Sequence, residues 1–194
     1  MYKRQEQQLF ADYEVKVDCK AGCGTCCFLG KIDARAHDIL ALADWIQRNF
    51  TPEERDGVLE RARAHAEAVK GLTLEQHLRT VRACPVLRDM KCSAHPGRPS
   101  ACRIGHSTNV HICERAYQNP DDLAAASGSH PESKLAMTVA ADGTAFAFLE
   151  SGFDKNVYDL GSALAEALAD SAPLERWLRG EPAFSPEARA KQQG

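Results

Sequence analysis

The sequence lacks any long apolar segment, and this and related absences set the first limits on its class. No run of about 18 apolar residues occurs, so no segment is expected to cross a membrane. The N-terminal stretch MYKRQEQQLF is polar and has no apolar core of the kind found in secretory signals, so we expect a cytoplasmic protein. The H-E-x-x-H, G-x-S-x-G and P-loop motifs are also missing, which argues against hydrolase and kinase chemistry.

An excess of basic side chains is missing as well. The chain has 24 Lys and Arg residues against 27 Asp and Glu residues, which gives a formal net charge of −3 at pH 7. Because phosphate binding needs a basic surface, nucleic acid is not an expected partner. The 194 residues, 44% hydrophobic and 26% charged, have the composition of an ordinary globular protein and can bury a core.

Cysteine stands out among the residues that are present. Four cysteines fall within nine residues and four more within thirty. They are Cys19, Cys23, Cys26 and Cys27 in the first segment, and Cys84, Cys92, Cys102 and Cys113 in the second. In a reducing compartment, clustered thiols are more often metal ligands or redox groups than disulfides, so we predict that all eight bind metal. Disulfides and unligated buried thiols are the alternatives.

The spacing within the first segment favours more than one metal ion. Cys23-x2-Cys26 has the tight turn that points two sulfurs at one ion, and Gly24 eases that turn. The side chains of neighbouring Cys26 and Cys27 diverge, so both cannot easily serve one tetrahedral ion. Cys27 therefore serves a second metal, bridges two ions, or is a buried thiol. Eight cysteines suffice for two four-sulfur sites or for one polynuclear cluster.

Basic residues flank the second cysteine segment. Residues 79–103 hold one acid, Asp89, and six basic side chains, namely Arg79, Arg82, Arg88, Lys91, Arg98 and Arg103. An ion bound by four thiolates has net negative charge, so Arg98 and Arg103 are expected to neutralise it and to donate hydrogen bonds to sulfur. The alternative of a solvated basic face applies equally to Arg79, Arg82 and Arg88.

Three histidines lie in or near the second segment. His95, His106 and His111 are each a candidate ligand, with a surface role or a role beside the ligands as the alternative. The others, His37, His65, His77 and His130, lie far from any cysteine in the sequence, and we expect them to be solvated.

Capping signals and apolar spacing predict a mainly α fold, in which several short helices are joined by irregular loops that metal clamps together. Capping boxes at Thr51 and Thr73 predict one helix to about Lys70 and a short one after it. Further helices are expected at 33–47 with Asp33 as N-cap, at 110–118, after Asn119, from Asn156 through Leu168, and at 173–179. An Asp142-Gly143 pair predicts a β-hairpin over 135–149, with a broken helix as the alternative.

These elements suggest a division of the chain by role. We expect a lead-in over residues 1–18 and a cysteine-cluster metal-binding domain over 19–118. A helical extension over 119–180 would pack on that domain, and the prolines and polar end of 181–194 predict a loosely held tail.

The cysteine constellation resembles the YkgJ-type cysteine-cluster family, a zinc- or iron-chelating domain named for its CxxCxxCC motif. The matching residues are Cys19, Cys23, Cys26, Cys27, Cys84-Pro85, Cys92-Ser93, Arg98-Pro99, Cys102-Arg103 and Cys113. Two departures are a first gap of three residues instead of two, and His95 where an aromatic residue usually precedes the Arg-Pro pair. The resemblance implies chelation of zinc or iron, without an assigned reaction.

The expected function is therefore chelation of Zn²⁺ through cysteine thiolates, with iron or an iron–sulfur cluster as the alternative ion. An iron-dependent enzyme remains open, because some members of the family are flagellin lysine methylases. Cys19-x3-Cys23-x2-Cys26 also has the spacing of a radical-SAM cluster loop. Thiol redox chemistry at Cys26 and its neighbours is a further alternative.

Overall fold

The computed structural model describes residues 8, 10–20, 22–28, 31–122 and 128–191. The fold is mainly α, as predicted, with 58% of the described residues helical. In the described part, the strands form two small antiparallel pairs, β1–β4 and β2–β3. None of the helices in these ranges is both long and apolar enough to cross a lipid bilayer.

The bounds of the elements, in chain order, are as follows. The α-helices are α2 (Ala36–Asn49), α3 (Pro52–Val69), α4 (Leu74–Leu78), α5 (Ser100–Ile104), α6 (Val110–Gln118), α7 (Pro131–Glu150), α8 (Leu160–Ala169) and α9 (Ala172–Leu178). The strands are β1 (Asp33–Arg35), β2 (Leu87–Arg88), β3 (Lys91–Cys92) and β4 (Val157–Asp159), and the 3-10 helices are η1 (Thr25–Phe28), η2 (His95–Gly97) and η3 (Pro186–Ala188).

Helices with strong local capping signals begin where the sequence predicts. Thr51 and Thr73 each form a complete capping box, at the start of α3 and of α4. Asn109 accepts a hydrogen bond from the N–H of His111 and starts α6, which has the predicted bounds. In each case the side-chain oxygen satisfies an N–H group that the first helical turn leaves without a partner.

Two predicted caps are wrong because strand pairing takes precedence over the local signal. Asp33 does not cap α2 but lies in β1, opposite Asp159 of β4, and the helix begins after Arg35. Asn156 does not cap α8; its side chain donates to Asp154, at 2.6 Å. The cap is Asp159, whose Oδ1 accepts from the N–H of Ser162 at 2.9 Å.

The predicted hairpin over 135–149 is also wrong, since this segment lies within the continuous helix α7. Pro131 occupies the first turn and His130 accepts from the N–H of Ser133, so the helix has a start signal that lies before the alternating stretch. Alanine, leucine and methionine dominate the segment, and their helix propensity outweighs the cost of about 1 kcal/mol for Gly143. A hairpin in this segment would also have lacked a third strand on which to pack.

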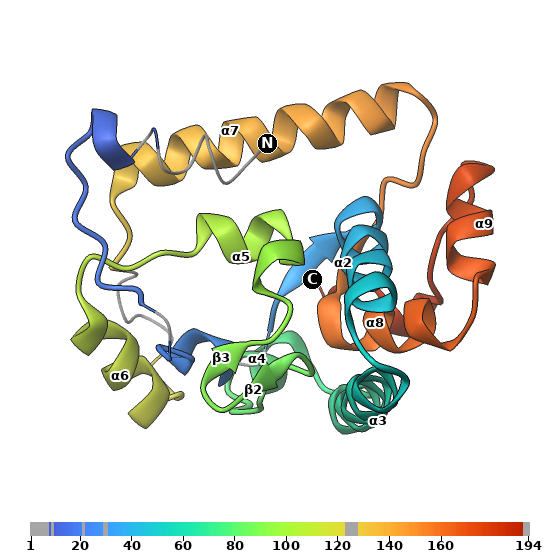
Figure 1. Ribbon diagram of the computed structural model, residues 1–194, viewed down its shortest axis with the longest axis horizontal. Helices are drawn as coiled ribbons and strands as arrows, with labels where there is room; N and C mark the ends of the chain where they lie inside the picture. The colour runs from blue at the N-terminus through green and yellow to red at the C-terminus, as the bar shows by residue number, and fades with distance from the viewer. Residues whose placement is uncertain (1–7, 9, 21, 29–30, 123–127, 192–194) are drawn as a thin grey trace.

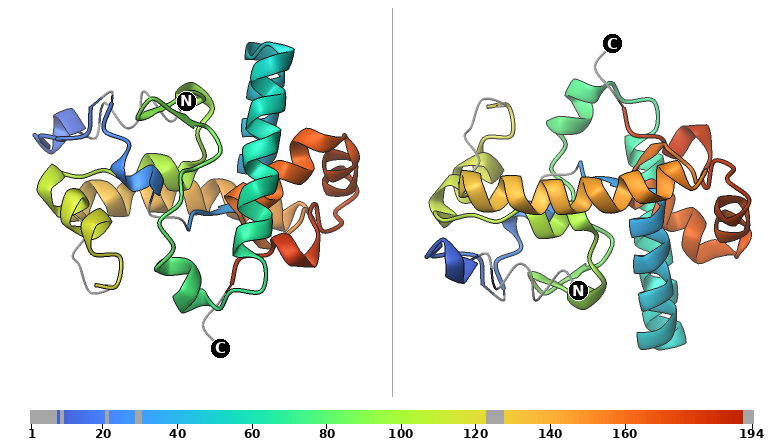
Figure 2. Two further views of the ribbon diagram at one scale, coloured as in Figure 1. Left: turned by 90° about the horizontal axis from the view of Figure 1, so that it is seen from below. Right: turned by 90° about the horizontal axis from the view of Figure 1, so that it is seen from above.

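Helices α2, α3, α8 and α9 lie together at one end of the molecule, and α6 lies at the other end (Figure 1). Helix α8 packs against α2 and α3, and Ile39, Leu42 and Leu164 from these elements are fully buried. Helix α7 runs along the length of the molecule, as the further views also show (Figure 2). The sequence predicts a loosely held tail over 181–194, and this is wrong at Phe184 and Ala188, which are 2% exposed. The ring of Phe184 packs against Tyr158 and holds this segment on the core. The short helix expected after Asn119 would fall largely on residues 123–127, outside the described residues.

Candidate metal centre

The two cysteine segments, separated in sequence by α2, α3 and α4, meet through main-chain hydrogen bonds. The N–H of Cys84 donates to the carbonyl oxygen of Cys27 at 2.8 Å, and the N–H of Arg82 donates to that of Phe28 at 2.8 Å. Further along, the N–H of Asp18 donates to the carbonyl oxygen of Ser107 at 2.9 Å. The first segment therefore lies between two parts of the second.

Close packing at Gly24 supports the same arrangement. A β-carbon at this position would lie 2.8 Å from the carbonyl oxygen of Met90, so only glycine fits beside the turn that joins β2 and β3. On the other side, α6 covers η1, and the rings of Phe28 and Tyr117 meet edge to face at 5.5 Å. In Figure 1, the first cysteine segment accordingly lies beside the β2–β3 turn.

Four thiols form what we call the first thiol group, Cys19, Cys23, Cys26 and Cys113. Burial raises the pKa of Cys19, and the charges of the other three members raise it further. The N–H of Ser107 donates to the sulfur of Cys19 at 3.2 Å, which favours the thiolate. The group thus combines three residues of the first segment with the last cysteine of the second.

The other four thiols form the second thiol group, Cys27, Cys84, Cys92 and Cys102. Burial raises the pKa of Cys84 to about 12, and the charge of Cys92 adds to this rise. Burial also raises the pKa of Cys102, again with contributions from Cys84 and Cys92. A metal ion would supply the positive charge that these buried thiols need in order to ionise.

The neighbours Cys26 and Cys27 lie at the boundary between the two groups. The hydrogen bond from Cys27 lowers the pKa of Cys26 to about 6 and raises that of Cys27. The charge of Cys26 also raises the pKa of Cys19 in the first group and of Cys84, Cys92 and Cys102 in the second. Cys26 therefore has a position from which it can interact with either group.

A comparison with protein families identifies this region. The family model CxxCxxCC, described as a "putative zinc- or iron-chelating domain", matches residues 18–123, more than half of the chain. The chain belongs to this family. The resemblance found in the sequence is thereby confirmed, and CxxCxxCC membership supports binding of a metal ion, zinc or iron. No curated protein and no solved structure matches the chain.

The donor set of this CxxCxxCC chain fits such an ion chemically. All eight cysteines are free thiols, distributed over two neighbourhoods, and soft thiolates bind both zinc and iron. Among the described residues, the group of three or more ligand atoms that all lie within 4.8 Å of one another is that of His65, His77 and Asp159, and it contains no cysteine. The structure thus gathers the sulfurs without showing them in ligand contact.

The basic residues of the CxxCxxCC domain divide into two kinds. Burial raises the pKa of Cys92, and the charges of Arg98 and Arg103 oppose that rise. These two arginines therefore lie where the sequence predicted a compensating charge, and Arg103 is oriented by donating to the carbonyl oxygens of Arg98 and Pro96. Arg79 and Arg88 instead form exposed ion pairs, the first with Glu75 and Asp121 and the second with Glu54.

The candidate histidines also differ from one another. His106 is buried, and its Nδ1 lies 3.0 Å from the carbonyl oxygen of Ile104. Its Nε2 accepts from the N–H of His130 at 3.1 Å, so both ring nitrogens already have protein partners. His111 is exposed and pairs with Glu114 at 2.9 Å. His95 begins η2. In this arrangement His106 anchors the start of α7 to the domain.

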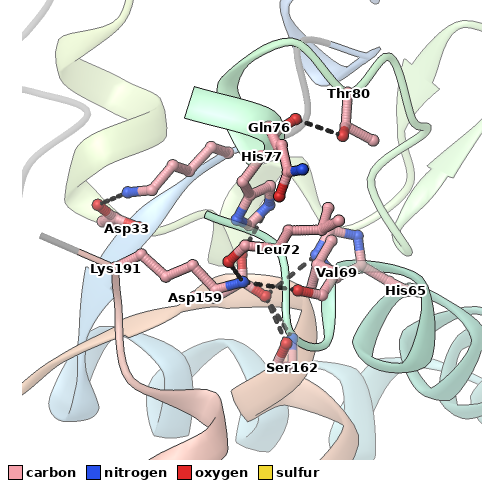
Figure 3. A network of polar contacts seen from close by, with 11 residues as sticks. Asp33, His65, Val69, Leu72, Gln76, His77, Thr80, Asp159, Ser162 and Lys191 are labelled. Carbon is pink, nitrogen blue, oxygen red and sulfur yellow. Dashed lines mark hydrogen bonds and ion pairs between the residues drawn. The ribbon is translucent and has the colours of Figure 1, made fainter. Parts of the chain in front are cut away.

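The expectation that His65 and His77 are solvated is wrong. Their exposed fractions are 4% and 1%, and both rings point at the carboxylate of Asp159 (Figure 3). A sequence signal existed for His65, because it continues the buried stripe of Val58, Ala62 and Val69 along α3 at helical spacing. No signal pointed to Asp159, which pairing of β4 with β1 brings to this place.

Proposed function

We propose that this chain chelates zinc through the thiolates of its cysteines, as two four-sulfur centres that correspond to the first and second thiol groups. The observation that carries the proposal is the pair of main-chain hydrogen bonds between residues 27–28 and 82–84, which holds thiols from distant parts of the chain together. Division between Cys26 and Cys27 also agrees with the divergence of adjacent side chains. Four protein ligands fill the coordination sphere of each ion and leave no position for a substrate, as in structural zinc sites.

Zinc is favoured over iron by the surroundings of the thiols. Arg98 and Arg103 compensate the negative charge of a four-thiolate zinc centre. The intervals between Cys84, Cys92, Cys102 and Cys113 are long and uneven, unlike the compact run of a ferredoxin. When bound, each ion would supply a cross-link between segments that are far apart in the sequence. The free thiols suit a reducing compartment, and we therefore place the protein in the cytoplasm.

Metal content tests the proposal directly. In protein produced with both zinc and iron supplied, we expect two zinc ions per chain in the thiol groups, so elemental analysis should find at least two. Cys23→Ser and Cys102→Ser remove one ligand from the first and the second group, and each should lose one ion. Ser93→Ala is the matched control, because its hydroxyl donates to Val86 beside the second group and offers no thiolate. Full zinc retention in both cysteine variants would contradict the proposal.

A redox function is the second candidate, favoured by the lowered pKa of Cys26 next to another thiol. In that case the metal-free protein would react with a thiol reagent first at Cys26, and mild oxidation would join it to a nearby cysteine. An iron–sulfur centre, as part of a protein-modifying enzyme, would instead show charge-transfer absorption in anaerobically prepared protein. A colourless sample would exclude the iron–sulfur centre, and metal-free protein without a fast-reacting thiol would exclude the redox function.

A further inference from the structure

Outside the two thiol groups, the described residues contain a buried cluster of side chains that are able to bind metal. It consists of His65 from α3, His77 from α4 and Asp159 from the end of β4. Nε2 of His65 lies 3.0 Å from Oδ1 of Asp159, and Nε2 of His77 lies 3.7 Å from its Oδ2. Figure 3 shows the three side chains converging from three different elements.

Helix capping explains only one oxygen of the Asp159 carboxylate. Oδ1 accepts from the N–H and the hydroxyl of Ser162, at 2.9 and 2.6 Å, and is the atom nearest to His65. Oδ2 is buried without a hydrogen-bond partner among the described residues, and the same is true of Nε2 of His77. Buried polar atoms without partners are rare and indicate an absent water or ion.

The geometry around these two atoms suits a shared ion better than a direct contact. At 3.7 Å they are too far apart for a hydrogen bond. Nitrogen and oxygen ligands lie about 2.0–2.2 Å from zinc, which places two ligands of one ion about 3–3.6 Å apart. The observed separations of 3.0 and 3.7 Å lie close to that range. Small side-chain movements would therefore bring one atom of each residue into contact with one ion.

A lysine and a small cavity lie near the cluster. Lys191, whose charge acts on both His77 and Asp159, donates to the carbonyl oxygens of Val69 and Leu72. A cavity of about 10 Å³, space for about one water molecule, is lined by residues that include His65, Asp159, Cys27 and Cys84.

We propose that His65, His77 and Asp159 bind one divalent transition-metal ion, zinc or ferrous iron, at a site separate from the two thiol groups. Two imidazoles and one carboxylate are a ligand set that leaves coordination positions open, unlike four thiolates. Two of the three residues, His65 and Asp159, line the cavity together with Cys27 and Cys84, so an open position of the ion on that side would face the second thiol group. The proposal does not depend on zinc binding by the cysteines.

Zinc is the probe for the test, and X-ray absorption of the zinc-loaded full chain gives the main measurement. We expect wild-type protein to show outer-shell scattering from imidazole. Asp159→Asn should remove that scattering together with one zinc per chain, because Asn keeps the capping oxygen but not the carboxylate. Ser162→Ala is the matched control: it removes a hydrogen bond to Oδ1 and should leave the zinc content unchanged.

Each outcome decides the matter. Wild-type zinc without imidazole scattering overturns the proposal even if Asp159→Asn does not fold. Imidazole scattering that persists in folded Asp159→Asn assigns the rings to other histidines and also overturns it. The cysteine proposal is tested separately in the same spectra: Cys102→Ser should weaken the sulfur signal and leave that of imidazole unchanged. Imidazole scattering that depends on Asp159, with sulfur absent from the spectrum, would support this site and refute the thiolate centres.

Discussion

Replacing Gly24 by alanine should destabilise the domain, although alanine is usually the better residue in a folded chain. The added β-carbon would lie 2.8 Å from the carbonyl oxygen of Met90 and 3.2 Å from Cδ1 of Leu87. Ordinary contacts between carbon and oxygen begin at about 3.3 Å, so the β2–β3 turn must move by roughly 0.5 Å. The main chain of Met90 cannot rotate out of the way as the end of a side chain could.

The expected magnitude follows from two opposing effects. Overpacking of this size costs about 1–3 kcal/mol, and the smaller conformational entropy of an unfolded alanine offsets about 0.4–1 kcal/mol. The free energy of unfolding should therefore fall by about 1–2 kcal/mol. Because the movement separates Cys23 and Cys26 from the second segment, affinity for zinc should fall as well.

Urea denaturation of zinc-loaded protein, together with competition against a zinc chelator, measures both effects. Gly143→Ala is the matched control, since this glycine lies within α7 and a β-carbon there would meet no atom within 4 Å. It should raise the free energy of unfolding by about 1 kcal/mol and leave zinc affinity unchanged. A Gly24→Ala protein as stable as wild type would show that the first cysteine segment does not pack on the β2–β3 turn.

Three further predictions follow from the same structure. Met90 has a φ of 59°, which L-residues adopt at a cost of about 1–2 kcal/mol, so Met90→Gly should raise the denaturation midpoint, and a lower midpoint would contradict the assigned turn. Burial lowers the pKa of His77 below its ordinary 6.5. As the pH falls, His77 is therefore protonated at a higher pH in the unfolded chain than in the folded one. The metal-free protein should lose stability as the pH falls below about 6.5, and melting curves of His77→Gln should show a weaker dependence. Removing metal with a chelator from protein kept free of oxygen and of added reductant should raise the number of thiols reactive toward a colorimetric reagent to eight, and fewer than eight after unfolding under these conditions would contradict the free state of all cysteines.

The parts of the fold that the sequence predicts are those decided within a few residues. Thr51 and Thr73 cap their helices through hydrogen bonds to residues three positions away, so their neighbours suffice to identify them. Asp142-Gly143 failed as a turn signal because its meaning depends on residues further away along the chain. A type I′ turn is favoured only when the flanking strands pair, and the flanks of this pair belong to one long helix.

The candidate sites depend on contacts that no local pattern contains. The thiol motif and its family could be recognised from spacing, because the cysteines of each segment are close in sequence. The meeting of His65 and His77 with Asp159 joins residues more than eighty positions apart, through the pairing of β1 with β4. The local sequence does not contain the register between distant strands. For this reason Asp33 and Asn156 were wrongly predicted as caps, and Asp159 was missed.

The position of α8 has a practical consequence for anyone who shortens or transplants this protein. The family match stops at residue 123, yet Leu164 and Tyr158 complete the interior beneath α2 and α3. A fragment cut at the motif boundary would expose that apolar interior to water and would leave the edge of β1 unpaired. Residues 157–188 therefore belong in any fragment that is meant to fold, because the core of this chain includes residues beyond the family match.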